Sequence, residues 1–349
     1  MARTLTLPTP DDFHLHLRDG AMLEAVLPAT ARVFARAIVM PNLVPPVVTT
    51  ADAVAYRQRI MAALPEGMAF TPLMTAYLTE ATDPDDLERG FGEGVFTAVK
   101  LYPAHATTNS AHGVGDLRTV YPVFERLERI DGILCIHGEV TDPEVDVFDR
   151  EAVFIERTLA PLRRDFPNLR IVLEHVTSKA GADFVEAADD RLGATVTPQH
   201  LMVDRNAMLV GGIRPHLYCL PILKRRRDRD ALRRLVEIGF PRLFLGTDSA
   251  PHAQHLKENA CGCAGCYSAP VALEAYAQVF DEIGCLQRLP DFASRFGARF
   301  YGLAANAGTV TLVEEAWTPP EQIVVGGDVG TVRPLLAGEV VRWRVADRP

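Results

Sequence analysis

Ile133-Leu134-Cys135-Ile136-His137 and Ile171-Val172-Leu173-Glu174-His175 repeat one arrangement, a short apolar run that ends in a histidine. Both runs have the length and the β-branched content of buried parallel strands. Amphipathic segments alternate with such runs along the chain, and this alternation is the signature of repeated β-α units. The two stretches therefore predict parallel strands whose ends carry polar side chains.

Six further apolar runs extend this pattern over most of the chain. They are Phe13–Leu17, Ala37–Met40, Phe70–Leu78, Phe96–Tyr102, Ala194–Thr197 and Leu243–Gly246. The segments between them place apolar residues at i, i+3 and i+4, as amphipathic helices do. Helix boundaries are marked by Thr82-Asp83-Pro84 at a start and by Gly239 at an end. Eight strands alternating with helices fit a closed parallel barrel or an open doubly wound sheet.

The polar residues at the strand ends decide between these two architectures. Only a closed barrel brings many strand ends onto one small mouth, whereas an open sheet would spread them along a line. The sequence therefore predicts a (β/α)8 TIM barrel. Six polar residues fall at the ends of the predicted strands: His16, Asn42, Lys100, His137, His175 and Asp248.

The predicted barrel occupies residues 1–303, and residues 304–349 are different in character. This last segment contains short β-rich pieces separated by Pro and Gly, so we expect a C-terminal extension packed on the barrel. Some barrel enzymes add a β-sandwich built from both termini. Because His14 lies so near the start of the chain, we expect no N-terminal contribution here.

Composition argues against several classes of function. A net charge of -9 disfavours a nucleic-acid partner, and the one basic stretch, Lys224–Arg234, is interpreted as a solvated helix face. No apolar stretch reaches the roughly 18 residues that cross a bilayer, and residues 1–13 lack the hydrophobic core of a signal peptide. We therefore expect a cytoplasmic protein without a membrane partner and, from six dispersed cysteines, reduced thiols.

The histidines and the buried lysine suggest metal chemistry. His14 and His16 lie in one predicted strand, where the two-residue period points both rings to the same side. A lone His-x-His is more often packing or surface chemistry than a metal site. Lys100 ends a buried run, where an uncompensated ammonium is costly unless its head reaches solvent. Beside metal ions, a lysine carboxylated by carbon dioxide would instead serve as an anionic bridge.

Three further residues could complete such a site. His137 and His175 could each be a core histidine, but together they offer the two nitrogens that a second zinc ion would bind. Asp248 could ligate a metal and move a proton, or it could simply cap a helix.

The order of these residues along the chain resembles that of the amidohydrolase superfamily, and the local sequences are similar to those of the short, single-domain dihydroorotases of bacteria. The resemblance covers nearly the whole chain. Its most specific stretches are His14-Leu15-His16-Leu17-Arg18-Asp19, Met40-Pro41-Asn42, Lys100-Leu101-Tyr102-Pro103, His137-Gly138-Glu139, Thr197-Pro198-Gln199-His200-Leu201, Arg214-Pro215 and Gly246-Thr247-Asp248-Ser249-Ala250-Pro251-His252.

The resemblance implies a specific metal centre. In it, His14, His16 and Asp248 hold one Zn2+ ion. His137 and His175 hold a second. N6-carboxylated Lys100 and a hydroxide bridge the two ions.

The resemblance also implies the substrate, the reversible pair (S)-dihydroorotate and N-carbamoyl-L-aspartate of UMP biosynthesis, and a homodimer. Asp248 would carry a proton from the hydroxide to the leaving ring nitrogen. A loop over residues 103–116 would close on the substrate. The substrate contacts implied are Arg18, Asn42 and His252 to the carboxylate, the backbones of Leu220 and Ala264 to the ring, and Thr107 and Thr108 from the loop.

Several alternatives stay open at this point. A hydantoinase or an allantoinase would share the metals and the cyclic-amide chemistry, and a phosphotriesterase-like hydrolase would prefer a pocket without Arg18. A non-catalytic scaffold on the same fold would be expected to have lost metal ligands. Cys261-Gly262-Cys263-Ala264-Gly265-Cys266 could form a separate zinc knuckle with His252 or His255, or a loop whose glycines let the backbone approach the substrate.

Overall fold

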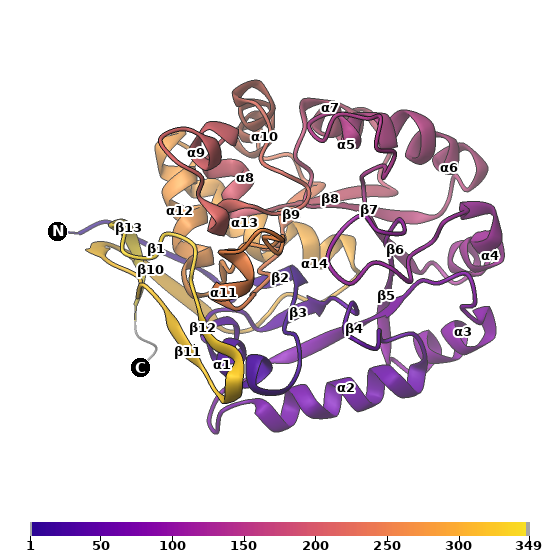
Figure 1. Cartoon of the computed structure of the whole chain (residues 1–349), viewed down its shortest axis with the longest axis horizontal. Helices are drawn as coiled ribbons and strands as arrows, with labels where there is room; N and C mark the ends of the chain where they lie inside the picture. The colour runs from indigo at the N-terminus through magenta and orange to yellow at the C-terminus, as the bar shows by residue number, and fades with distance from the viewer. Residues whose placement is uncertain (1, 347–349) are drawn as a thin grey trace.

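Eight parallel strands form the centre of the molecule (Figure 1), in the spatial order β2-β3-β4-β5-β6-β7-β8-β9. The computed structural model describes residues 2–346. Each predicted apolar run coincides with one strand, so the barrel prediction is confirmed. The strands are β2 (Asp11–Leu15), β3 (Arg36–Val39), β4 (Thr71–Tyr77), β5 (Phe96–Leu101), β6 (Ile133–His137), β7 (Arg170–Glu174), β8 (Leu192–Val196) and β9 (Leu243–Leu245).

The barrel closes where the ends of β2 and β9 meet. The Asp248 amide donates to the His14 carbonyl over 2.9 Å, and the His16 amide donates to the Ser249 carbonyl over 3.1 Å. Asp12 supports the same seam, because its carboxylate accepts from the Thr247 amide at 2.9 Å and from the Thr247 hydroxyl at 2.6 Å. The contacts that close the barrel therefore also place His14, His16 and Asp248.

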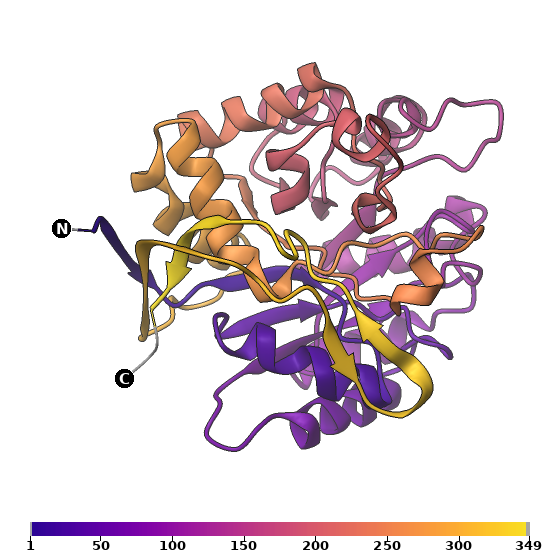
Figure 2. The same cartoon turned by 60° about the vertical axis from the view of Figure 1, so that its left-hand side comes forward.

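Helices surround the barrel (Figures 1 and 2). As predicted, α3 begins after the capping residue Asp83, and Gly239 ends α10 with a left-handed φ of 68°. The helix α10 includes residues 226–234 of the basic stretch and buries Leu232, Leu235 and Val236, as expected for a solvated helix face. The expectation is wrong for Lys224, which precedes the helix and is buried. The helices are α1 (Gly20–Ala31), α2 (Thr50–Ala63), α3 (Pro84–Gly92), α4 (Tyr121–Arg129), α5 (Arg150–Phe154), α6 (Ala160–Asp165), α7 (Lys179–Ala187), α8 (Pro198–Met202), α9 (Arg205–Leu209), α10 (Arg226–Ile238), α11 (Gln254–Lys257), α12 (Ala272–Glu282), α13 (Leu289–Ser294) and α14 (Phe296–Phe300).

Apolar side chains fill the amino-terminal half of the barrel interior. Phe13 stacks on Tyr301 with ring centroids 4.9 Å apart and meets Phe244 edge-on at 5.3 Å. Cys135 and Val172 belong to the same buried cluster. Because this end is packed solid, the polar residues of the strands are confined to the carboxyl-terminal mouth, where barrel enzymes build their active sites.

A second, antiparallel sheet lies beside the barrel and corrects one expectation from the sequence (Figure 2). It has the order β1-β10-β13, with β1 (Thr4–Pro8), β10 (Thr309–Trp317) and β13 (Val341–Val345). The expectation that the N-terminus adds nothing to the C-terminal extension is therefore wrong. Thr4 pairs with Val313 and Pro8 pairs with Thr309. A five-residue strand needs so little chain that it fits ahead of β2, in spite of the early position of His14.

The rest of the C-terminal segment forms a two-stranded ribbon of β11 (Ile323–Val325) and β12 (Gly330–Val332). Within residues 2–346, none of the helices has the length and apolar character that a bilayer crossing requires.

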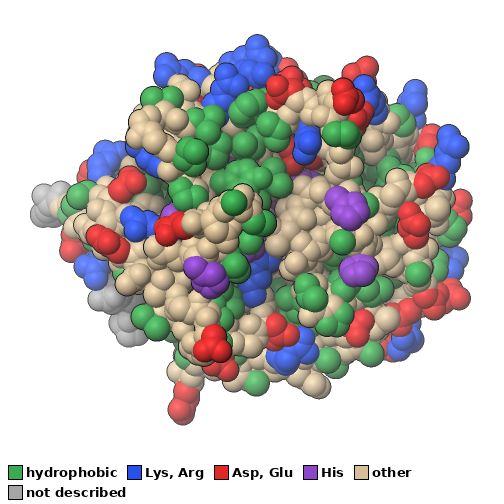
Figure 3. All heavy atoms as spheres, viewed as in Figure 1, with side chains coloured by type: hydrophobic (Ala, Val, Ile, Leu, Met, Phe, Trp, Pro, Cys, Tyr) green, Lys and Arg blue, Asp and Glu red, His purple; other side chains and the backbone are tan. Residues whose placement is uncertain are grey.

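One face carries exposed apolar side chains at Leu209, Val210 and Ile213, which are 50%, 62% and 80% exposed. Apolar side chains gather on the face shown in Figure 3, over the region of α8 and α9.

Candidate metal centre and substrate cavity

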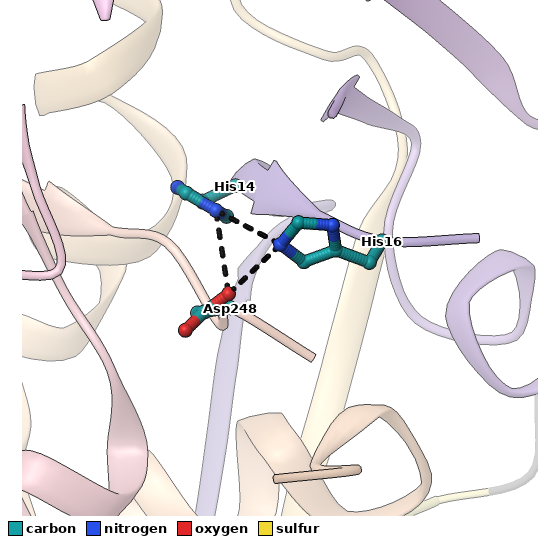
Figure 4. Close-up of side chains that lie close together, drawn as sticks. All are labelled: His14, His16 and Asp248. Carbon is teal, nitrogen blue, oxygen red and sulfur yellow. Dashed lines mark hydrogen bonds and ion pairs between the residues drawn. The ribbon is translucent and has the colours of Figure 1, made fainter. Parts of the chain in front are cut away.

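His14, His16 and Asp248 converge at the mouth of the barrel (Figure 4). The Asp248 Oδ1 atom lies 3.3 Å from His14 Nε2 and 3.1 Å from His16 Nε2, and the two ring nitrogens lie 3.4 Å apart. All three side chains are buried, and their ligand atoms lie within 4.8 Å of one another. Two imidazole nitrogens and a carboxylate in this arrangement form a cluster that can hold a metal ion such as zinc.

His137, His175 and Lys100 adjoin this cluster. His137 ends β6, His175 follows β7, and Lys100 lies near the end of β5. The ring centroids of His137 and His175 are 4.9 Å apart, and those of His14 and His175 are 5.0 Å apart. All of these side chains are buried. The structure thus brings the six predicted metal ligands into one polar group inside the barrel mouth.

The Lys100 ammonium is the most unusual member of this group. The side chain is fully buried, and its Nζ atom has no hydrogen-bond partner among residues 2–346. Burial lowers the pKa of Lys100, although the charge of Glu174 opposes this effect. His175 Nδ1 and His16 Nδ1 are also buried and have no hydrogen-bond partner within the described residues. The imidazole nitrogens of His14 and His16 and the Asp248 carboxylate are donors that zinc prefers, so the residues present fit a metal centre.

Glu174 orients His14, and sequence reasoning missed it. Its Oε2 atom lies 2.8 Å from His14 Nδ1 and accepts from the Thr195 hydroxyl over 2.5 Å. Burial alone would raise the pKa of Glu174, but the His14 ring lowers it below its usual value, so the carboxylate stays ionised. Nδ1 of His14 therefore carries a proton, and Nε2 faces Asp248 and His16. The available signal was an acidic residue inside an apolar run, since a buried carboxylate requires a partner.

The backbone at three strand ends is held in the left-handed region that non-glycine residues seldom adopt. Arg18, His175 and Asp248 have φ angles of 60°, 40° and 44°. Such conformations cost on the order of 1–3 kcal/mol each and concentrate at functional sites. The Thr195 hydroxyl helps to hold the turn at His175, because it accepts from the His175 amide at 2.7 Å. The barrel therefore holds these residues at the mouth against a local backbone preference.

A small cavity of about 20 Å³ lies beside His16 and Asp248. Predicted substrate residues from distant parts of the chain surround it. His252 does not line this cavity, but its Nε2 atom lies 3.1 Å from Arg18 Nη2. The lining residues are His16, Arg18, Asn42, Thr107, Thr108, Leu220, Asp248, Ala250, Ala264 and Gly265.

The segment 103–116 lies over this cavity and has neither regular helix nor strand. Asn42 Nδ2 donates to the Thr108 carbonyl over 3.0 Å, and the Thr108 hydroxyl donates to the Ala264 carbonyl over 3.3 Å. Asn109 Nδ2 donates to the Asn42 carbonyl over 3.1 Å. These bonds join the segment to both sides of the cavity, so the described conformation is a closed one.

The cysteine-rich stretch 261–266 forms part of the cavity wall. Within residues 2–346, its thiols belong to no group of three or more ligands close enough to hold a metal ion. The structure therefore favours the loop interpretation over a zinc knuckle. Gly265 has a φ of 154°, its amide donates to the Tyr218 carbonyl, and a Cβ atom there would lie 2.6 Å from the Ala250 carbonyl oxygen. Only glycine allows this close approach.

Comparison with known proteins places the chain in a family. Residues 6–317 match the amidohydrolase family. The chain is 59% identical to a dihydroorotase of Yersinia enterocolitica over 343 residues, 98% of each chain. Its fold is similar to the dihydroorotase of Campylobacter jejuni, with a TM-score of 0.90, 35% identity and coverage of 99% and 98%. It is also similar to the dihydroorotase of Saccharomyces cerevisiae in complex with 5-fluoroorotic acid, with a TM-score of 0.91, 32% identity and 99% coverage of both chains. The chain belongs to the amidohydrolase family and, within it, to the dihydroorotases.

Proposed function

We propose that the chain is a hydrolase of cyclic amides that interconverts (S)-dihydroorotate and N-carbamoyl-L-aspartate, a step of UMP biosynthesis. The observation that carries the substrate assignment is the position of Arg18. Its guanidinium lines the same cavity as His16 and Asp248, and it forms no ion pair with a carboxylate within residues 2–346. A half-buried arginine without a carboxylate partner, beside a metal cluster, fits a substrate whose carboxylate lies close to the amide that is cleaved.

The proposed cofactor is a pair of zinc ions. The first would be held by His14, His16 and Asp248, the second by His137 and His175, with N6-carboxylated Lys100 between them. Support for the carboxylation comes from the buried Nζ atom, which has no hydrogen-bond partner within residues 2–346, and from the lowered pKa of Lys100, because the neutral amine is the form that reacts with carbon dioxide. When bound, the zinc pair supplies a water that is nucleophilic at neutral pH and polarises the ring carbonyl.

The protein residues bind, orient and transfer the proton. Arg18, with Asn42 and His252, would hold the substrate carboxylate. The backbone groups of Leu220 and Ala264 would form hydrogen bonds with the polar edge of the ring. The Asp248 carboxylate faces the cavity, where it would accept the proton of the attacking water and deliver it to the departing ring nitrogen.

Two threonines would complete the site by excluding water. Thr107 and Thr108 line the cavity from the segment 103–116, which the structure describes in a closed position. Their hydroxyls would hydrogen-bond the bound substrate and keep bulk water from the reacting amide.

We further infer a homodimer, supported by the exposed apolar side chains of Leu209, Val210 and Ile213 on one face. A boundary at residue 303 between barrel and extension, and a location in the cytoplasm, stay predictions.

A substrate comparison tests this function. The metal-loaded protein is assayed for ring opening of dihydroorotate, of a 5-substituted hydantoin and of a phosphotriester, before and after a chelator. We expect turnover of dihydroorotate alone, its loss after chelation and its return with zinc. Preferential turnover of the hydantoin would overturn the substrate assignment, and full activity after removal of all metal would overturn the chemistry.

A further inference from the structure

His137 makes a contact that the proposed metal centre does not by itself explain. Its Nε2 atom lies 3.0 Å from Glu139 Oε2, and both side chains are buried, with exposures of 1% and 2%. A carboxylate only accepts hydrogen bonds, so Nε2 of His137 carries the proton and Nδ1 is the nitrogen left for a metal. This is the reverse of His14, whose Nδ1 faces Glu174 and whose Nε2 faces Asp248.

A buried lysine compensates the Glu139 carboxylate. Lys224 Nζ lies 3.6 Å from Glu139 Oε1, and the side chain of Lys224 is only 1% exposed. A buried ion pair is costly to assemble and adds little net stability, so its presence calls for another explanation.

The position of Lys224 in the chain suggests why the pair is present. It follows Leu220, which lines the substrate cavity, by four residues, and its Nζ atom also donates to the Ile222 carbonyl over 3.3 Å. The buried pair thus joins the segment that carries Leu220 to the strand that carries His137.

We propose that Glu139 and Lys224 are positioning residues that fix His137 in the Nε2-protonated form and present its Nδ1 atom to the second metal ion. The inference rests on the two-metal function proposed above. Neither residue lines the substrate cavity. Carboxylates that orient metal-bound histidines typically change metal affinity 10- to 100-fold when they are replaced.

The test measures metal binding rather than activity. Purified Glu139→Gln, Glu139→Leu and Lys224→Met proteins are stripped of metal, and zinc binding is measured by competition with a chromophoric chelator, alongside the Tm of each metal-free protein. The control is Glu144→Gln, which makes the same chemical change at an exposed residue of the following segment.

We expect the first zinc ion to bind each variant as it binds the wild type. The second should bind about 10- to 100-fold more weakly to Glu139→Leu. Glu139→Gln should lose less affinity for the second ion, because its amide oxygen can still accept from His137, although the unpaired Lys224 lowers its metal-free Tm below that of the control. Lys224→Met should weaken binding of the second ion as well.

Two results would overturn the inference while the wild type binds two zinc ions. One is unchanged affinity for the second ion in Glu139→Leu. The other is an equal loss of affinity for both zinc ions, in proportion to the fall in the Tm of the metal-free variant. A pair with a purely structural role would give that result. A wild type that binds a single ion contradicts the proposed function, and this inference with it.

Discussion

The His14 ring and the Glu174 carboxylate face each other across the barrel mouth, with Nδ1 and Oε2 2.8 Å apart. His14 comes from β2, while Glu174 ends β7. The contact fixes the ring so that Nε2 points toward Asp248 and His16. The availability of that nitrogen for a metal therefore depends on a residue 160 positions away in the chain.

Replacement of Glu174 by Gln should weaken the first metal site. The amide cannot carry the negative charge that holds the His14 proton, so we expect first-site zinc affinity to fall about 10- to 100-fold. Metal content after dialysis against a weak chelator measures this loss. The exposed Glu24→Gln serves as the matched control. Equal retention of both ions by the two variants would show that Glu174 does not orient the ligand.

Lys100→Met should abolish metal binding and activity without harming the fold. Methionine has a similar length but no amine to carboxylate, and the substitution removes a buried Nζ atom that has no hydrogen-bond partner among the residues described. The metal-free variant should therefore have a Tm equal to or above that of the metal-free wild type. Calorimetry and zinc analysis check both statements. Two firmly bound zinc ions in Lys100→Met would refute the bridging role.

Arg18→Met should reduce substrate affinity while leaving the metals in place. Loss of charge-assisted hydrogen bonds to the substrate carboxylate should raise the KM for dihydroorotate by about 10- to 100-fold. Steady-state kinetics with parallel zinc analysis separates this effect from damage to the metal centre. An unchanged KM would mean that the carboxylate is held elsewhere.

Alanine at both Thr107 and Thr108 should lower kcat severely at unchanged zinc content. The two side chains line the cavity, and Thr108 is hydrogen-bonded to Ala264 in the closed segment. The exposed His112→Ala in the same segment is the control. If the double variant matched the control in kcat, the closing segment would have no part in catalysis.

The barrel could be predicted from the sequence because its central strands are short, nearly continuous apolar runs. Residues 133–137 form β6 with the boundaries expected. The polar residues that follow such runs could therefore be assigned to the mouth of the barrel. The grouping of the candidate ligands followed from that geometry, because a closed barrel collects strand ends.

Contacts between side chains or strands far apart in the chain could not be predicted in the same way. Glu139 and Lys224 lie 85 positions apart, and neither gives a local periodicity that identifies the other. The pairing of β1 with β10 joins segments near the two ends of the chain, and the five paired residues on each side carry no register signal of their own.

The most direct test of the two-metal account is a crystal structure of the zinc-loaded protein with dihydroorotate, with diffraction data recorded at the zinc absorption edge. The account predicts two anomalous peaks about 3.5 to 4 Å apart between His14 and His175, density from Lys100 Nζ to both, and the substrate carboxylate at Arg18. A single peak, or peaks away from these histidines in a fully active protein, would contradict it.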